Sequence, residues 1–244
     1  MLGKRRSYTE AVQSRRKLAR RLGALFLLFV SYELISGLFL ASYAVKSSAM
    51  APAVLPGDRI IASPLAFGPS TLVGKLPGIS KPGRGDIVLV EPNYVGPVGF
   101  WARLFDSFVR FVTFQLVSPE RGGKDPPLPA LTLQRVVGLP GDTIQMDDFV
   151  FKVKQADSDQ FLTEFELSSR SYDISHDAAP DGWKADLPGS GHLDARALGP
   201  DEFFLSGDAR SSSSDSRLWG PVHAAQFRAM VLLRYWPLSS IGAL

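Results

Sequence analysis

The chain has no cysteine among its 244 residues. That absence excludes disulfide bonds, thiolate metal sites and a cysteine nucleophile, so its stability has to come from packing. Histidine is also scarce, and the three histidines, His176, His192 and His223, lack the spacing of metal ligands. The sequence therefore predicts no metal site and no cofactor.

A strong overall charge is lacking as well, since the net charge is +3. The basic residues are unevenly distributed, with eight in residues 1–21 against a single acid, Glu10. From residue 46 onward, acidic side chains slightly outnumber basic ones. Because the basic cluster adjoins an apolar segment and does not lie on a folded face, nucleic-acid binding is not expected.

The apolar segment that follows extends from Leu22 to Val45 and contains no lysine or arginine and one acid, Glu33. At about 1.5 Å per residue it would span roughly 36 Å, enough to cross a hydrocarbon core of about 30 Å. We therefore predict a transmembrane anchor at residues 22–45. Because basic flanks remain in the cytoplasm, residues 1–21 form a cytoplasmic tail and residues 46–244 face outward.

A cleaved secretory signal is the alternative to an anchor, because Ser42-Tyr43-Ala44 resembles a small-residue cleavage site. The apolar run exceeds the 7 to 15 or so residues of a typical signal, which favours a retained anchor. Glu33, near the middle of this run, is costly in lipid. Either a partner helix satisfies it, or the carboxyl stays protonated or bonds to Ser36 or to neighbouring backbone.

Beyond the anchor the sequence changes to short β-rich runs separated by proline and glycine. Turn residues such as Pro56-Gly57-Asp58 and Pro140-Gly141-Asp142 separate these runs. Strands that follow one another without amphipathic helices favour a mainly β fold, an antiparallel sandwich-like or barrel-like domain. The predicted strands are Arg59 to Ser63, Asp86 to Glu91, Leu133 to Gly138, Phe149 to Lys154, Glu202 to Ser206 and Arg228 to Trp236.

Residues 97–117 depart from this pattern, because their apolar side chains recur with a helical period. Large aromatic residues would share one side of the helix, with Arg103, Asp106 and Arg110 on the other. Either a core helix or an interfacial helix at the membrane surface explains this pattern. A second membrane span is disfavoured by the three charges. Residues 155–198 are richer in polar residues, proline and glycine, and suggest loops or an inserted subdomain.

Several short motifs follow the apolar segment in a fixed order, and together they resemble type I signal peptidases, the leader peptidases of the S26 peptidase family. The resemblance covers residues 22–242. It includes, in chain order, Ser47-Ser48-Ala49-Met50-Ala51-Pro52 with Gly57-Asp58, Arg84-Gly85-Asp86-Ile87-Val88, Gln134-Arg135-Val136-Val137-Gly138-Leu139-Pro140-Gly141-Asp142, Ser206-Gly207-Asp208-Ala209-Arg210 with Asp215-Ser216-Arg217 and Trp219-Gly220, and the ending Tyr235-Trp236-Pro237 with Ile241-Gly242.

The resemblance implies an antiparallel β domain behind one transmembrane helix of the bacterial inner membrane, with the amino terminus in the cytoplasm. Members of that family remove signal peptides from exported proteins as serine endopeptidases. They use a serine nucleophile and a lysine base, and a lysine acts as a base near neutral pH only when burial lowers its pKa. In the family pattern the nucleophile directly precedes methionine and the base directly precedes arginine.

Both of these positions differ in this chain, where Ala49 stands at the nucleophile and Gln134 at the base. An alanine methyl cannot attack, and a neutral glutamine cannot take up a proton. Other family positions are matched. Ser47 corresponds to the serine that helps hold the oxyanion, Met50 and Pro52 correspond to the groove segment, and Ser213, Asp215 and Arg217 correspond to the polar support around the lysine.

One substitute nucleophile is available in the sequence, because Ser48 precedes Ala49 and Lys46 is close to it. A shift of one residue along an extended segment turns a side chain to the opposite face, which argues against this substitute. Three functions remain open. They are a non-catalytic membrane protein that binds signal peptides or an active signal peptidase paralogue, an active peptidase with a rearranged site, and a structural membrane module. Membrane lipid is a partner in each case.

Overall fold

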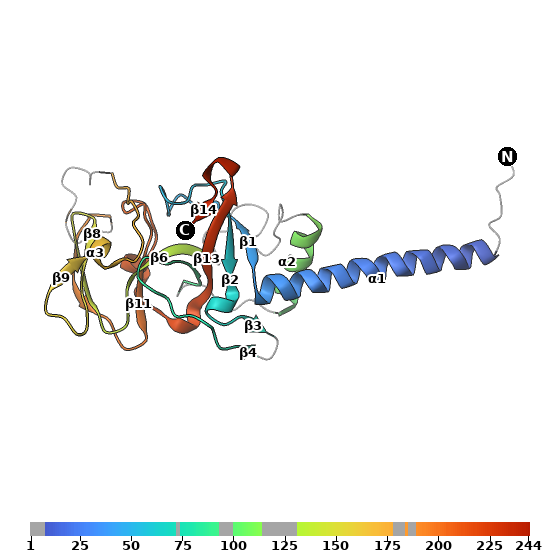
Figure 1. Ribbon diagram of the computed structural model, residues 1–244, viewed down its shortest axis with the longest axis horizontal. Coiled ribbons are helices and arrows are strands. Elements are labelled where there is room, and N and C mark those ends of the chain that lie inside the picture. Colours follow the sequence, from blue (N-terminus) through green and yellow to red (C-terminus); the bar gives the residue numbers. More distant parts are fainter. Residues whose placement is uncertain (1–7, 72–73, 93–99, 114–130, 178–183, 185–188) are drawn as a thin grey trace.

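A computed structural model of the chain describes residues 8–71, 74–92, 100–113, 131–177, 184 and 189–244. Its first element is the long helix α1 (Tyr8–Leu38), which extends away from a β-rich body (Figure 1). The segment Val12–Leu38 is apolar and long enough to cross a membrane, and it is the one such helix among the described residues. Most of its side chains are exposed, since only 6% of its apolar window is buried.

The apolar segment 22–45 is not helical throughout, because α1 ends at Leu38 and the chain enters strand β1 (Ala41–Ala44). This strand pairs with β2 (Arg59–Ser63), with Ala41 opposite Ala62. The hydroxyls of Ser42 and Tyr235 lie 2.7 Å apart and join β1 to strand β13 (Phe227–Trp236), on the far side of β2. Hydrophobicity alone could not reveal this boundary, because pairing with β2 defines the strand. Ser42-Tyr43-Ala44 is thus part of the sheet.

The main sheet is antiparallel and carries most of the core. Its strand order is β1-β2-β13-β5-β6-β11-β12, and β14 adds to the end of β13. The long strand β13 bridges β2 and β5 near the middle of the molecule (Figure 1). The remaining strands of this sheet are β13 (Phe227–Trp236), β5 (Ile87–Val90), β6 (Thr132–Gly138), β11 (Glu202–Ser206), β12 (Val222–His223) and β14 (Gly242–Ala243).

A second antiparallel sheet, of order β10-β7-β8-β9, lies at the end of the body farthest from α1 (Figure 1). The helix α3 (Glu164–Leu167) begins with a capping box between Thr163 and Glu166. The strands are β7 (Thr143–Asp147), β8 (Val150–Lys154), β9 (Phe161–Thr163) and β10 (Leu193–Ala197). Smaller elements are η1 (Pro64–Ala66), β3 (Ser70–Thr71), β4 (Gly74–Lys75), α4 (Ser216–Trp219), η3 (Ala224–Gln226) and η4 (Leu238–Ser240).

Strand β5 shows how the core is divided, because it is buried on both faces. Val88 and Val90 pack in one apolar cluster, while Ile87 and Leu89 pack in another. This division follows from the two-residue period of a strand. A third cluster, around Phe151 and Phe204, joins the main sheet to the second sheet. The three clusters make one continuous body out of the two sheets.

The six strands predicted from sequence are confirmed as β2, β5, β6, β8, β11 and β13, and the mainly antiparallel β fold is confirmed with them. The helical period of residues 97–117 is confirmed by α2 (Phe100–Val112), whereas residues 97–99 and 114–117 lie outside the described residues. The polar segment 155–198 contains β9, α3 and β10, of which β10 pairs with β7. Part of that segment therefore belongs to the second sheet.

Candidate functional site

The segment after β1 carries Ala49 and forms a compact turn. The backbone N–H groups of Ala51 and Val54 donate to the carbonyls of Ser48 and Met50, at 2.9 Å each. Met50 belongs to the core, with only 1% of its surface exposed. Its side chain packs in the core and holds the turn against the sheet. The motif comparison suggested that Met50 lines an open groove, and its burial contradicts this. Pro52, in contrast, is exposed.

Ala49 lies directly against the loop that follows β11. Its carbonyl accepts a hydrogen bond from the backbone N–H of Ala209 at 3.0 Å. A Cβ on Gly207 would lie 2.5 Å from the Ala49 oxygen and 2.4 Å from Ser213 Cβ, so only glycine permits this approach. The N–H of Ala49 donates to Ser47 Oγ at 3.1 Å. Ser47 therefore lies on the N–H side of Ala49, where the resemblance puts an oxyanion.

Gln134 reaches the same loop from strand β6, where it lies opposite Val88 of β5. Its side chain is buried, with 1% exposed. The amide Nε2 donates to the carbonyl of Ser214 at 2.9 Å, whereas Oε1 is buried without a hydrogen-bond partner among the described residues. Ala49 and Gln134 thus contact two parts of a single loop, at residues 207–209 and at Ser214.

Asp215 holds the shape of that loop. Its carboxylate is fully buried and accepts hydrogen bonds from Ser206 Oγ at 2.8 Å and Ser213 Oγ at 2.6 Å. Arg217 donates to both carboxylate oxygens, from Nε at 2.9 Å and Nη2 at 2.8 Å. Asp215 also caps α4 by accepting from the Arg217 backbone N–H. Ser213, Asp215 and Arg217, predicted as the polar support, are therefore in contact with one another.

The charge of Asp215 is stabilised by its neighbours. Burial by itself raises the pKa of this carboxyl, because it disfavours the charged form. The hydrogen bonds and positive charge of Arg217, together with the Ser213 and Ser206 hydroxyls, outweigh burial and lower the pKa below its usual value. The loop therefore has at its centre a carboxylate whose charged form is stabilised.

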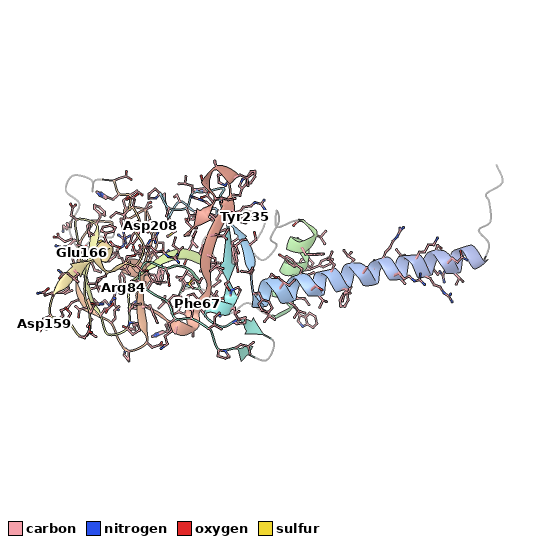
Figure 2. All side chains as sticks on the ribbon, viewed as in Figure 1. Phe67, Arg84, Asp159, Glu166, Asp208 and Tyr235 are labelled. Atoms are coloured by element: carbon pink, nitrogen blue, oxygen red, sulfur yellow. The ribbon has the colours of Figure 1, made fainter. Side chains whose placement is uncertain are left out.

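A second ion pair fixes the same loop to β6. Arg135 follows Gln134 and donates to both oxygens of Asp208, from Nε at 2.8 Å and Nη2 at 2.6 Å. Both side chains are buried, and the third donor of Arg135 reaches the Gly85 carbonyl at 2.7 Å. The Tyr172 ring stacks on the Arg135 guanidinium, whose central carbon lies 3.9 Å from the ring centroid. In Figure 2, Asp208 lies in the interior of the β-rich body.

The hydrogen-bonded side chains of Ser213, Asp215, Arg217, Arg135 and Asp208 form what we call the polar frame. Further residues, which the motifs did not indicate, belong to it. Ser175 donates from its backbone to Asp208 at 2.9 Å, accepts from the Arg210 backbone at 2.7 Å, and donates from Oγ to the Ala51 carbonyl at 2.9 Å. Glu164 accepts from Arg210 at 2.5 Å and from the Tyr172 hydroxyl at 2.7 Å. Burial and the Glu164 carboxylate raise the pKa of Tyr172. No local motif in the polar segment 155–198 could have identified these residues.

The substitute pair lies outside this frame. Ser48 and Lys46 are both exposed. Neither side chain makes a hydrogen bond or an ion pair with another residue that the structure describes. Their side chains are therefore not held in the geometry that a nucleophile and its base require.

Comparison with known proteins gives matches to one family. Residues 18–236 match the family described as signal peptidase, peptidase S26. The chain is 22% identical over 201 residues to signal peptidase I of Leptolyngbya laminosa, covering 82% of this chain and 70% of the relative. It is 21% identical to signal peptidase IB of Staphylococcus aureus, covering 86% and 85%. A crystal structure of a signal peptidase I from Enterococcus faecalis matches at 18% identity and a TM-score of 0.32, covering 63% of this chain and 98% of that one.

The fold and the site define a class of protein: an antiparallel β domain behind an apolar N-terminal helix, with a loop-held polar frame between two strands. Because the family match extends over most of the chain, the protein belongs to the signal peptidase family, peptidase S26.

Proposed function

We propose that this chain is a membrane-anchored member of the signal peptidase family that lacks the Ser/Lys dyad and acts as a non-catalytic binding or partner protein. The observation that carries the proposal is the pair Ala49 and Gln134, which contact the same loop and of which neither has a side-chain hydroxyl or amine. An oriented amide can donate a hydrogen bond but cannot accept the proton of an attacking hydroxyl.

The surroundings of Gln134 support the proposal, because they suit the base that is missing. A lysine at this buried position would be desolvated, which lowers the pKa of its amine towards neutrality. It would also find the Ser214 carbonyl as a hydrogen-bond acceptor. We therefore expect the scaffold to remain competent for catalysis once both groups are supplied.

The proposed role is recognition of exported chains at the outer face of the bacterial inner membrane. In this arrangement α1 spans the membrane, the basic residues before Leu22 remain in the cytoplasm, and the β domain lies outside. The strand β1 supports a retained anchor, because cleavage after Ala44 would remove a strand that pairs with β2. The proposed ligands are signal peptides of exported proteins, and an active signal peptidase paralogue is the proposed protein partner.

Cleavage of a fluorogenic signal-peptide substrate by the full chain in detergent tests the loss of activity. We expect the natural chain to be inactive and the double variant Ala49→Ser, Gln134→Lys to cleave. Removal of one catalytic group costs about four to six orders of magnitude in serine proteases, so neither single variant should cleave measurably. Thermal unfolding of each variant verifies that a silent chain is folded.

Two further measurements separate the three functions. Fluorescence anisotropy with an uncleaved signal peptide, against a scrambled peptide, should reveal specific binding by the natural chain. A folded chain that neither cleaves nor binds would favour a structural membrane module. Cleavage by the natural chain that Ser48→Ala abolishes would instead establish a rearranged active site and contradict the proposal.

A further inference from the structure

The connection between β5 and β6 is much longer than its geometry requires. The two strands are antiparallel neighbours, and Val90 at the end of β5 lies opposite Thr132 at the start of β6. A turn of two to five residues or so would join them. The chain instead passes through residues 91–131 and builds α2 within them. Within this connection, α2 lies beside α1 (Figure 1).

One edge of α2 packs against the apolar part of α1 through aromatic rings. The ring of Phe29 lies 5.6 Å from Phe108 and 5.4 Å from Phe111 between centroids, and Tyr32 lies 5.3 Å from Phe111. Phe29 and Tyr32 precede the end of α1 at Leu38 by nine and six residues. At the rise of an α-helix, these contacts lie roughly 14 and 9 Å before that end. They are therefore within the apolar part of α1.

Other large apolar side chains of α2 are mostly exposed. Trp101 is 77% exposed, Phe105 60% and Val112 53%. These three residues lie on one face, since they are separated by four and seven positions. The neighbouring surface of α1 is equally apolar and exposed, with Phe26, Leu28 and Ile35 each more than half exposed. Both helices thus expose large apolar side chains close to the contact between them.

We propose that α2 is seated in the outer leaflet of the bilayer beside α1, with the face of Trp101, Phe105 and Val112 against lipid acyl chains. The proposal rests on the membrane anchoring of α1 proposed above. We favour lipid as the partner of this face, because α2 lies directly beside α1. The lipid that surrounds the exposed apolar side chains of α1 would therefore also contact α2. An amphipathic helix with a large apolar face is also the form that binds at a membrane interface.

A position of α2 in the outer leaflet would affect how the candidate site is held relative to the membrane. In chain order α2 precedes β6, the strand that carries Gln134. A helix held in the leaflet gives this part of the domain a second attachment besides α1. It would keep the loop around Ala49 and Gln134 at a fixed height above the membrane from which a signal peptide emerges.

The absence of cysteine allows a direct test, because a single introduced thiol can be labelled alone. The variants Phe105→Cys, Leu25→Cys and Asp159→Cys are each labelled with a nitroxide in the full chain. The chain is reconstituted in vesicles of phosphatidylcholine and phosphatidylglycerol. Collision with oxygen, which is enriched in lipid, is compared with collision with a water-soluble nickel complex. Asp159 is the aqueous reference, since it lies at the end farthest from α1 (Figure 2).

We expect the oxygen-to-nickel ratio at position 105 to follow that at position 25, and to exceed that at position 159 roughly tenfold or more. An aqueous ratio at 105 with a lipid ratio at 25 would overturn the seat of α2 and leave the anchor intact. An aqueous ratio at 25 would overturn the anchor itself. A label at 105 that neither reagent reaches would show that protein covers this face, and would also contradict the proposal.

Discussion

The polar frame around the site and the two positions at its centre are built differently. Asp208, Asp215 and Arg135 are buried, and the side chain of each makes at least two charge-assisted hydrogen bonds. Gln134, equally buried, makes one hydrogen bond and leaves Oε1 unpaired among the described residues. Ala49 contributes only backbone groups.

This difference separates what holds the loop from what would perform chemistry. Loss of a frame residue strands a buried charge, which is costly for the whole fold. The side chains at positions 49 and 134 are uncharged and hold no buried charge in place. The reactive groups can therefore be absent while the scaffold remains folded. The predictions below test this separation from the largest expected effect to the smallest.

The largest effect is expected for Asp208→Ala. The substitution leaves the Arg135 guanidinium buried without its bidentate partner, and breaking such a pair typically costs about 3–5 kcal/mol. Chemical unfolding of the full chain in detergent, followed by circular dichroism, measures the loss. Asp194→Ala is the matched control, because that side chain is fully exposed. Equal stability of the two variants would show that the ion pair does not hold the loop.

Asp215→Asn should cost about 3 kcal/mol or less, since hydrogen bonds to charged groups are worth about 1.5–3 kcal/mol. The pH dependence of the stability difference between the natural chain and this variant is more informative. The folded state lowers the pKa of Asp215, so the stability it provides is fully present above its unfolded pKa of about 3.9 and is lost as the pH falls through the folded value. The gap in unfolding free energy between natural chain and variant should therefore narrow below pH of about 4. A gap that widens in acid would contradict this assignment.

Much of the fold could be predicted locally, and the reasons are visible in single strands. β2 and β11 were predicted to the residue because short apolar runs lie between clear turn signals. β1 was missed because Ala41–Ala44 continues the hydrophobicity of α1, and only pairing with β2 makes it a strand. β7 was not among the predicted strands, although Ile144 and Met146 alternate with polar residues in it, and it pairs with β8 and β10.

Some residues of the candidate site could likewise be predicted from local sequence, and others could not. The motif order indicated Ser213, Asp215 and Arg217, which are close in sequence and contact one another directly. Ser175 and Glu164 could not be predicted, because they reach Ala51 and Arg210 across more than 40 residues of chain. The burial of Met50 was hidden for a similar reason, since the strands that cover it lie elsewhere in the sequence.

A smaller effect, about 2 kcal/mol, is expected for Gly207→Ala. The new methyl would overlap the Ala49 carbonyl and Ser213 Cβ, and overpacking of this kind typically costs about 1–3 kcal/mol. Gly242→Ala is the control, because nothing lies within 4 Å of its added Cβ. Comparison of the two melting temperatures measures how tightly Ala49 is held. If both alanines are tolerated equally, the approach of Ala49 to the loop is looser than the contacts indicate.

The smallest effect is expected for Gln134→Met, and this variant tests the comparison most directly. Methionine has a similar size and removes both the unpaired Oε1 and the donor to Ser214. Because Ser214 is exposed, water can replace the lost donor, and the free energy of unfolding should change by less than about 1 kcal/mol. The same denaturant series that measures Asp208→Ala gives this value. A loss as large as that of Asp208→Ala would make Gln134 part of the frame, and positions 49 and 134 could then no longer be treated as structurally free.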